Sequence, residues 1–265
     1  MLEVKGLSVS YLVNDQPVRA VKELSFSLAK GEALGIVGES GSGKSTVALA
    51  IMRLLPPAAR IETGEIIFNG QSLLALPEKE MIKVRGGKIS MIFQDPFTSL
   101  NPLFTVGDQI AEAVRVHQGL DRRTARQKAI AMLEMVQISQ AARRAADYPH
   151  QFSGGMRQRA MIAMALACQS ELLIADEPTT ALDVTIQAEI LTLLKELQKN
   201  LGLSIIYITH NFGIIKEVCQ RALVVQQGVL VETGNVADLL VAPRSAYTVG
   251  LLDALKVLTG RREGR

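Results

Sequence analysis

The chain has 265 residues, of which 48% are hydrophobic, and its 29 Lys and Arg against 26 Asp and Glu give a formal net charge of +3. This length allows one large domain or two modest ones, with a core that needs no disulfide bonds. So mild a positive charge, spread along the chain, is too weak to argue for nucleic acid as a partner, and we expect none.

Apolar runs and cysteines set further limits. The longest uninterrupted apolar run, Ala160 to Cys168, has nine residues, about half of what a membrane-spanning helix needs. The first residues lack the pattern of a secretory signal, so we expect the chain to stay in the cytoplasm. The two cysteines, Cys168 and Cys219, match no metal or redox spacing, which predicts buried, unreactive thiols.

The first two predicted elements are strands. Leu2 to Tyr11 and Val21 to Leu28 alternate apolar and polar residues, as half-buried strands do. A polar turn at 14–17 between them indicates an antiparallel pair at the edge of the fold.

A glycine-rich segment follows. Residues 38–45 read Gly-Glu-Ser-Gly-Ser-Gly-Lys-Ser and fit G-x-x-x-x-G-K-[ST] at each fixed position. An apolar run precedes them and a helix-like run follows, which is the context that a phosphate-binding loop requires. Such a loop turns backbone N–H groups toward an anion at the positive end of a helix dipole. Lys44 can then reach the β- and γ-phosphates, and the Ser45 hydroxyl is placed to bind the bridging Mg²⁺.

We therefore expect a nucleotide here, with an ordinary glycine-rich turn as the alternative. The residues expected to bind it are Gly38, Ser40, Gly41, Ser42, Gly43, Lys44, Ser45 and Thr46. Tyr11, upstream of the loop, is a candidate to stack on the base, although an exposed tyrosine at a strand end is an equal alternative.

The middle of the chain changes from strands to helices. Lys88 to Phe93 is a predicted strand that ends on Gln94, and the prolines of Asp95-Pro96 and Asn101-Pro102 then exclude a continued strand or helix. Val106 to His117 and Thr124 to Val136 carry apolar residues at spacings of three and four, as amphipathic helices do, with Thr105 and Thr124 as capping residues. We expect an all-helical insertion here, whose basic run at 122–128 is a solvated helix face.

Two further segments carry candidate functional residues beside a predicted helix or strand. Ser153-Gly154-Gly155 opens an apolar helix, which is again anion-binding geometry, although a helix-capping turn is the common alternative. Glu171 to Ala175 is a continuous apolar strand, as expected inside a parallel sheet, and it ends in Asp176-Glu177. At such an edge Asp176 would hold Mg²⁺ and Glu177 would orient or deprotonate an attacking water, whereas a helix cap is the alternative.

The last segment returns to strands and ends in helices. Leu203 to Ile208 is another apolar strand, and His210 follows it at the same sheet edge as Asp176 and Glu177, where it is a candidate to contact phosphate. Two short strands in Arg221 to Glu232, a helix at 236–241 and an amphipathic helix at 247–258 complete the chain.

Taken in order, these motifs resemble the nucleotide-binding subunit of ATP-binding cassette (ABC) transporters over nearly the whole chain. The resemblance makes Gln94 the Q-loop glutamine, Ser153 to Gly155 the signature, Ala181-Leu182-Asp183 the D-loop and His210 the switch histidine. It also favours the stacking role of Tyr11. Its implied site residues are Glu177, His210 and Gln94 for catalysis, Ser45, Gln94 and Asp176 for Mg²⁺, and Ser153, Gly154, Gly155 and Asp183 for ATP.

The fold implied is an α/β P-loop NTPase with a mixed, mainly parallel sheet, an antiparallel β subdomain and an inserted helical subdomain at about 95–164. The ATPase domain would span 1–241 and a short tail helix 242–265. The family mechanism places each ATP between the phosphate loop of one subunit and the signature of another, and hydrolysis then lets the subunits part.

Residues 148–159 and 93–102 look like the oligopeptide, dipeptide and nickel importer branch. That implies import of di- or oligopeptides, with nickel or a chelated metal as the alternative. It also implies a related partner ATPase, two transmembrane permease subunits, an extracytoplasmic binding protein and a peripheral position on the cytoplasmic face of the membrane. A soluble ABC ATPase acting on nucleic acid or ribosomes is a less favoured reading, and a non-catalytic nucleotide sensor ranks last.

Three departures from the family pattern stand out. Met156 replaces the usual Gln of the signature, which puts a contact across the dimer in doubt, and Asn211 follows the histidine where Asp is usual. The tail lacks the cysteines that many peptide-type subunits carry, which favours the nickel alternative.

Overall fold

The computed structural model describes residues 1–94, 99–180 and 182–260, the last six by backbone alone. The chain divides into two compact units, which are described separately: Met1–Leu76 with Ser204–Arg265, and Pro77–Leu203. The predicted Asp95-Pro96 break and Ala181 of the predicted D-loop lie outside the described residues. The division of an ATPase domain from a tail at residue 241 stays a prediction.

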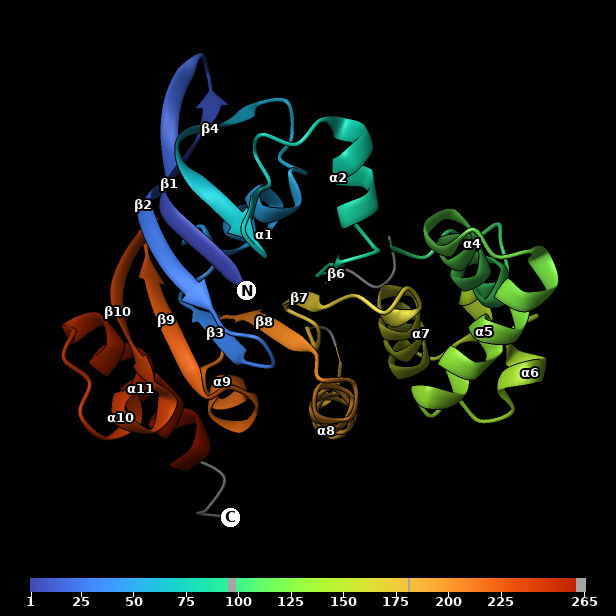
Figure 1. The fold of residues 1–265 in the computed structure, drawn as a ribbon. Helices are drawn as coiled ribbons and strands as arrows, with labels where there is room; N and C mark the ends of the chain where they lie inside the picture. Colours follow the sequence, from blue (N-terminus) through green and yellow to red (C-terminus); the bar gives the residue numbers. More distant parts are fainter. Residues whose placement is uncertain (95–98, 181, 261–265) are drawn as a thin grey trace. The chain divides into compact units, whose positions relative to one another are not determined.

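The first unit contains an antiparallel sheet of order β2-β1-β4-β5 (Figure 1). Its strands are β1 (Leu2–Val13), β2 (Gln16–Leu28), β4 (Ala59–Phe68) and β5 (Gln71–Ser72). Asn14 and Asp15 connect β1 to β2 with φ of 50° and 59°, the left-handed backbone of tight hairpin turns. The predicted antiparallel pair at the start of the chain is therefore confirmed.

The first unit also contains the strand that leads into the phosphate loop and the strands beside it. Strand β3 (Ala33–Val37) is fully buried and pairs in parallel with β8 (Ser204–Thr209) and β9 (Arg221–Gln226). Strand β10 (Val229–Asn235) pairs antiparallel with β9. Helices α1 (Lys44–Met52), α9 (Phe212–Val218), α10 (Val236–Val241) and α11 (Ala246–Gly260) complete this unit, and α9 contacts β3, β8, α10 and α11 (Figure 1).

The second unit is mainly helical around one parallel pair, β6 (Ile89–Ile92) with β7 (Leu172–Asp176). Helices α4 (Val106–Gln118) and α5 (Arg122–Met135) pack on each other and on α7 (Gly154–Leu166). The remaining elements are α2 (Glu78–Val84), α6 (Ala141–Arg144), the 3₁₀ helix η1 (Pro149–Gln151) and α8 (Val184–Leu201). Strands and helices together confirm the predicted α/β class.

One predicted helix cap was wrong. The structure keeps Thr105 as the N-cap of α4, where its side chain accepts a hydrogen bond from the N–H of Asp108. Helix α5, however, begins at Arg122 and its N-cap is Asp121 rather than Thr124. The Asp121 carboxylate accepts from the N–H groups of Arg123 and Thr124, two donors that would otherwise be unsatisfied in the first turn. The Thr124 hydroxyl also donates to this carboxylate at 2.6 Å, and this bond, together with those from the backbone, lowers the pKa of the Asp121 carboxyl.

The two thiols behave as predicted. Cys168 and Cys219 are free and buried, and burial raises the pKa of each thiol. Neither therefore forms the reactive thiolate near neutral pH. Across the described residues, no helix combines the length and the apolar character needed to span a membrane.

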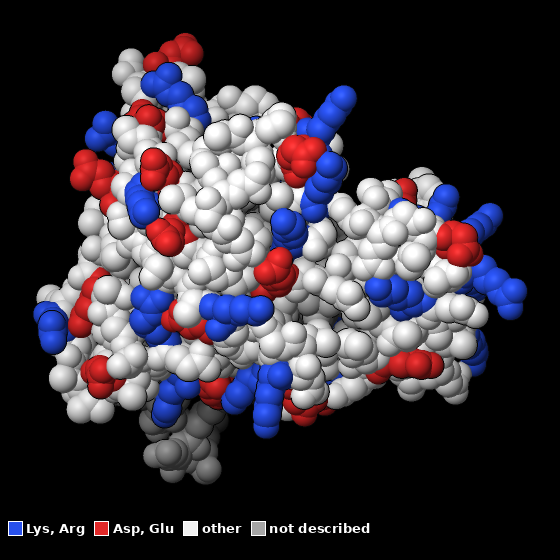
Figure 2. All heavy atoms as spheres, viewed as in Figure 1, with Lys and Arg blue, Asp and Glu red and all other residues white. Residues whose placement is uncertain are grey.

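Charged side chains of both signs are mixed on the surface of the protein (Figure 2). Basic and acidic side chains are interspersed on the face that Figure 2 shows. Several charged side chains of the protein form surface ion pairs, such as Arg19–Glu62 at 3.1 Å.

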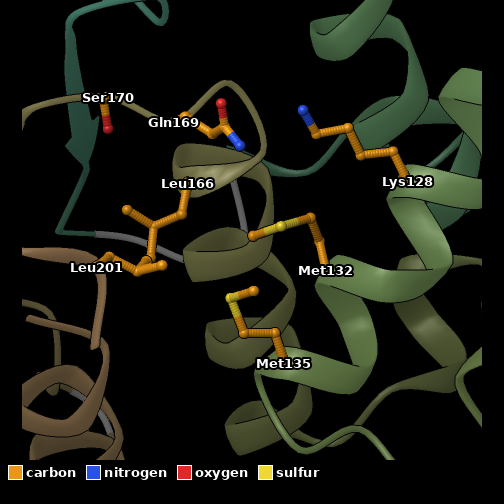
Figure 3. A pocket seen from close by; sticks show the side chains of 7 residues that line it. All are labelled: Lys128, Met132, Met135, Leu166, Gln169, Ser170 and Leu201. Atoms are coloured by element: carbon orange, nitrogen blue, oxygen red, sulfur yellow. The ribbon is translucent and has the colours of Figure 1, made fainter.

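A hollow of about 230 Å³ in the second unit lies between α5, α7 and the end of α8 (Figure 3). It is lined by Lys128, Met132, Met135, Leu166, Gln169, Ser170 and Leu201.

Candidate nucleotide-binding site

The phosphate loop connects β3 to α1, and its backbone turns where the motif has glycine. Gly41 has φ of 77° and Gly43, the N-cap of α1, has φ of 98°, conformations that are costly for other residues. Lys44 begins the helix and is only 5% exposed. Its ammonium donates to the carbonyl oxygens of Gly38 at 2.9 Å and Glu39 at 2.7 Å, so the cation is held inside the turn of the loop.

Neighbouring backbone packs tightly against this loop. A Cβ added at Gly38 would lie 2.0 Å from the carbonyl oxygen of Val225, and one at Gly43 would lie 2.3 Å from that of Ala20. The N–H of Gly228, in the β9–β10 turn, donates to the carbonyl oxygen of Ser42 at 2.9 Å. Glycine at 38 and 43 is therefore required by close packing as well as by the turn.

Two other predicted residues of the first unit lie beside this loop. The Tyr11 hydroxyl, on β1, is 3.2 Å from the Thr46 hydroxyl in the first turn of α1. Val37 pairs with Thr209 across β3 and β8, so Gly38 and His210 both follow the carboxyl ends of neighbouring parallel strands, where open α/β sheets bind ligands. The stacking role of Tyr11 and the phosphate contact of His210 stay predictions.

Asn211, which stands where the family usually has Asp, caps a helix in this structure. Its side-chain oxygen accepts from the N–H of Gly213 at 2.8 Å and caps α9. An amide oxygen serves this purpose as well as a carboxylate, so the departure leaves the local structure intact.

In the second unit, Gln94 and Glu177 lie together. Ile92 pairs with Ala175 across β6 and β7, which brings the ends of both strands to one edge. The Gln94 side-chain amide donates to Glu177 Oε2 at 3.2 Å, and the Thr180 hydroxyl donates to the same oxygen at 2.7 Å. Thr180 was not predicted from the sequence. Glu177 has φ of 48°, a strained backbone of the kind that clusters at functional sites.

Asp176 ends β7 and is 5% exposed. An oxygen donor such as its carboxylate suits Mg²⁺, which binds through one or two carboxylates together with substrate phosphates. The described residues contain no group of three or more acidic, His or Cys side chains able to hold a metal ion.

The signature serine and Asp183 are both helix caps. Ser153 Oγ accepts from the N–H of Met156 at 3.3 Å at the start of α7, and Asp183 Oδ1 accepts from Ile186 N–H at 3.0 Å at the start of α8. A Cβ added at Gly155 would lie 2.7 Å from Ile186 Cγ2, so the two helix starts pack closely. The capping alternative predicted for Ser153 is thus satisfied, the cap at Asp183 was not predicted, and the role of both residues toward ATP stays a prediction.

The structure therefore gathers the predicted residues into two groups. The first unit holds Tyr11, the phosphate loop and His210, and the second holds Gln94, Asp176, Glu177, the signature and Asp183. Tyr247 was not predicted from the sequence, although its hydroxyl accepts a hydrogen bond from the N–H of Glu39 in the phosphate loop at 3.0 Å. No local pattern pointed to this residue, which lies in the first turn of α11.

Fold and loop together define a P-loop nucleotide-binding protein of the α/β class. Residues 21–180 match the family model described as "ABC transporter", and the chain belongs to this family. It is an ABC-type ATPase that binds ATP. This confirms both the resemblance seen in the sequence and the predicted P-loop NTPase fold.

Curated relatives match along nearly the whole chain. It is 51% identical to the probable peptide ABC transporter ATP-binding protein y4tR of Sinorhizobium fredii, covering 100% of this chain and 78% of that protein. It is also 51% identical to the oligopeptide transport ATP-binding protein OppD of Bacillus subtilis, covering 99% and 74%. The glutathione import ATP-binding protein GsiA of Escherichia coli is 50% identical over 97% of this chain and 42% of its own length.

Solved structures of ABC cassettes share the fold. A dimeric, post-hydrolysis form of the cassette MJ0796 bound to ADP and Pi has a TM-score of 0.79 and 28% identity, covering 89% of this chain and 99% of that one. CbiO1 from Clostridium perfringens, part of the transporter complex cbiONQ, has a TM-score of 0.78 and 28% identity over 98% of each chain.

The close packing of Gly38 gives a direct test of the loop. We expect Gly38→Ala to weaken ATP binding about tenfold or more, because relieving the contact with Val225 must displace the loop backbone at a cost of about 1–3 kcal/mol. Gly250→Ala is the control, since a Cβ there meets nothing within 4 Å. Calorimetric titration with ATP measures both variants. Equal affinity in Gly38→Ala and wild type would mean that the loop does not hold the nucleotide.

Proposed function

We propose that this chain is the ATP-hydrolysing motor subunit of a membrane ABC importer for di- or oligopeptides. The observation that carries the substrate class is 51% identity to an oligopeptide transport ATP-binding protein along 99% of the chain. GsiA, named for glutathione import, supports the same class because glutathione is itself a small peptide.

We assign the chemical step to Glu177. Its Oε2 accepts hydrogen bonds from Gln94 and Thr180, which limit the orientation of the carboxylate, and a positioned carboxylate can orient a water molecule and accept its proton. Lys44 would neutralise the β- and γ-phosphates of ATP, and His210 would steady the γ-phosphate. The oxygen donors proposed for Mg²⁺ are the side chains of Ser45, Gln94 and Asp176, and a bound Mg²⁺ would offset the charge of the phosphates.

We assign the signature of this chain a role at the ATP of a second cassette. We infer that Ser153, Gly154 and Gly155 close over the ATP of a related but distinct partner ATPase, and that the partner does the same in return. Support comes from the family, in which MJ0796 has been solved as a dimer. Asp183, which caps α8, would lie at the same interface.

A groove of the second unit suits the permease. About 630 Å³ in volume, it is lined by Asn101, Phe104, Asp108, Gln109, Ala111, Glu112, Arg115, Arg122 and Arg126. Leu103 and Phe104 beside it are 79% and 55% exposed, and exposed apolar side chains with charged neighbours are typical of docking surfaces. We propose that this groove binds cytoplasmic loops of two transmembrane subunits, which place the chain peripherally at the inner face of the membrane, with an extracytoplasmic binding protein delivering the peptide.

Replacing the proposed base separates binding from hydrolysis. We expect Glu177→Gln to lower ATP turnover by about 10²–10⁴-fold, the usual contribution of a general base, and to leave ATP affinity within about twofold. Glutamine keeps an oxygen for the bonds from Gln94 and Thr180, so the local structure should persist. Phosphate release and ATP titration measure the two effects. Glu134→Gln, at an exposed site on α5, is the control, and unaltered turnover in Glu177→Gln would exclude the role.

Uptake by cells identifies the cargo. We expect cells carrying Lys44→Ala to lose uptake of a labelled dipeptide and to keep uptake of labelled nickel, because the lysine ammonium is needed to hold ATP. Loss of nickel uptake alone would contradict the peptide assignment and favour the metal importer. If both remained, the chain would not energise either import.

A further inference from the structure

The C-terminal helix α11 contacts the phosphate loop through the side chain of Tyr247. The backbone N–H of Glu39, the second residue of the loop, donates to the phenol oxygen of Tyr247 at 3.0 Å. Tyr247 is in the first turn of α11 and is partly buried. The two residues are 208 positions apart, so this contact exists only in the folded chain.

The bond to Tyr247 acts on the same peptide group that holds the loop lysine. The N–H of Glu39 and the carbonyl of Gly38 belong to one planar peptide unit. That carbonyl accepts a hydrogen bond from Lys44 Nζ at 2.9 Å, and the next carbonyl, of Glu39, accepts from Lys44 Nζ at 2.7 Å and from Ser42 N–H at 3.2 Å. A phenol that fixes the orientation of this peptide plane therefore also fixes where Lys44 lies.

The first turn of α11 is itself fixed to the sheet that carries the loop. Glu232, on β10, accepts hydrogen bonds from the N–H groups of Arg244 at 2.8 Å and Ser245 at 3.0 Å. Ser245 Oγ accepts from Tyr247 N–H at 3.2 Å. Partial burial acts to raise the pKa of the Glu232 carboxyl, but hydrogen bonds outweigh it and the pKa is lowered, so the carboxylate stays charged near neutral pH.

These contacts connect α11, the sheet and the phosphate loop to one another within the first unit. Strand β10 pairs with β9, and β9 pairs with β3, which leads directly into the phosphate loop. Buried side chains of α11, Thr248 at 0% and Leu252 at 5% exposure, add packing to the hydrogen bonds. Tyr247 is thus held on one side by the sheet and holds the loop on the other.

We propose that Tyr247 is a positioning residue for ATP binding, and that α11 is a strap that keeps the Gly38–Glu39 peptide and Lys44 oriented toward the phosphate chain. The proposal rests on the assignment of residues 38–45 as the ATP site. It gives the C-terminal helix a role in nucleotide affinity.

The test is Tyr247→Phe in the full-length chain, which keeps the ring and removes the hydroxyl. The Kd and KM for ATP should rise about fivefold, the effect of losing one neutral hydrogen bond, while kcat stays within about twofold. Hydrogen exchange of the Glu39 amide, followed by NMR, should become faster while the amides of α11 keep their wild-type exchange rates, which distinguishes loss of the hydroxyl from loss of helix packing. Val249→Ala, at a 39% exposed position of the same helix, is the matched control and should change none of these.

Two further variants distinguish a failure of the proposed role of Tyr247 from a failure of the assigned ATP site. Glu232→Ala removes both bonds that anchor the start of α11 and should raise the KM for ATP in the same direction as Tyr247→Phe. Lys44→Ala should abolish ATP binding; if it binds ATP like wild type, the assignment of the site is wrong. If Lys44→Ala loses ATP but Tyr247→Phe has unchanged KM and unchanged Glu39 exchange, the strap alone is overturned.

Discussion

The structure depends on one constraint, which is the shape of a short loop. The peptide groups of this loop must surround a strongly negative phosphate chain, and the loop must also hold a lysine side chain close to that phosphate chain. Such a turn needs left-handed backbone, which Gly41 and Gly43 supply. It also needs a cation fixed near the first turn of a helix, and Lys44 is held there by the carbonyls of Gly38 and Glu39. The loop binds phosphate only if the surrounding structure keeps it in this shape.

The first unit provides that support from several directions. The loop starts at the buried strand β3 and ends in α1, and it packs on the backbone of Ala20 and Val225. Gly228 holds Ser42 from the β9–β10 turn, and Tyr247 holds Glu39 from α11. Preorganisation of this kind lowers the entropy that a ligand would otherwise lose on binding. The contact of Tyr247 is therefore one of several that support the loop.

The second unit holds, at the end of a strand, the carboxylate that we propose as the base. Glu177 has a strained backbone and accepts two hydrogen bonds from Gln94 and Thr180. Holding a carboxylate in this way limits its rotamers, so it can orient a water molecule without reorganisation during the reaction.

Local patterns made much of this predictable. The phosphate loop was evident because its strand, glycines, lysine and helix are consecutive, and β7 was evident because a buried parallel strand is continuously apolar. Pairings between distant residues were not evident, because no local pattern encodes them: Gln94 with Glu177 is separated by 83 positions and Glu39 with Tyr247 by 208. The N-cap of α5 was misplaced because Asp121 and Thr124 both suit that position, and only the hydrogen bonds show that Asp121 occupies it.

Recognition of the phosphate chain is the central claim, and comparing adenine nucleotides tests it most directly. Titration of the purified chain with ATP, ADP and AMP, each with Mg²⁺, measures how affinity depends on the number of phosphates. The loop is built to hold the phosphates beyond the first, so ATP and ADP should bind and AMP should bind at least about a hundredfold more weakly, a difference of about 2.7 kcal/mol. Equal affinity for AMP and ATP would contradict the account, because it would show that the base and ribose, rather than the loop, provide the binding energy.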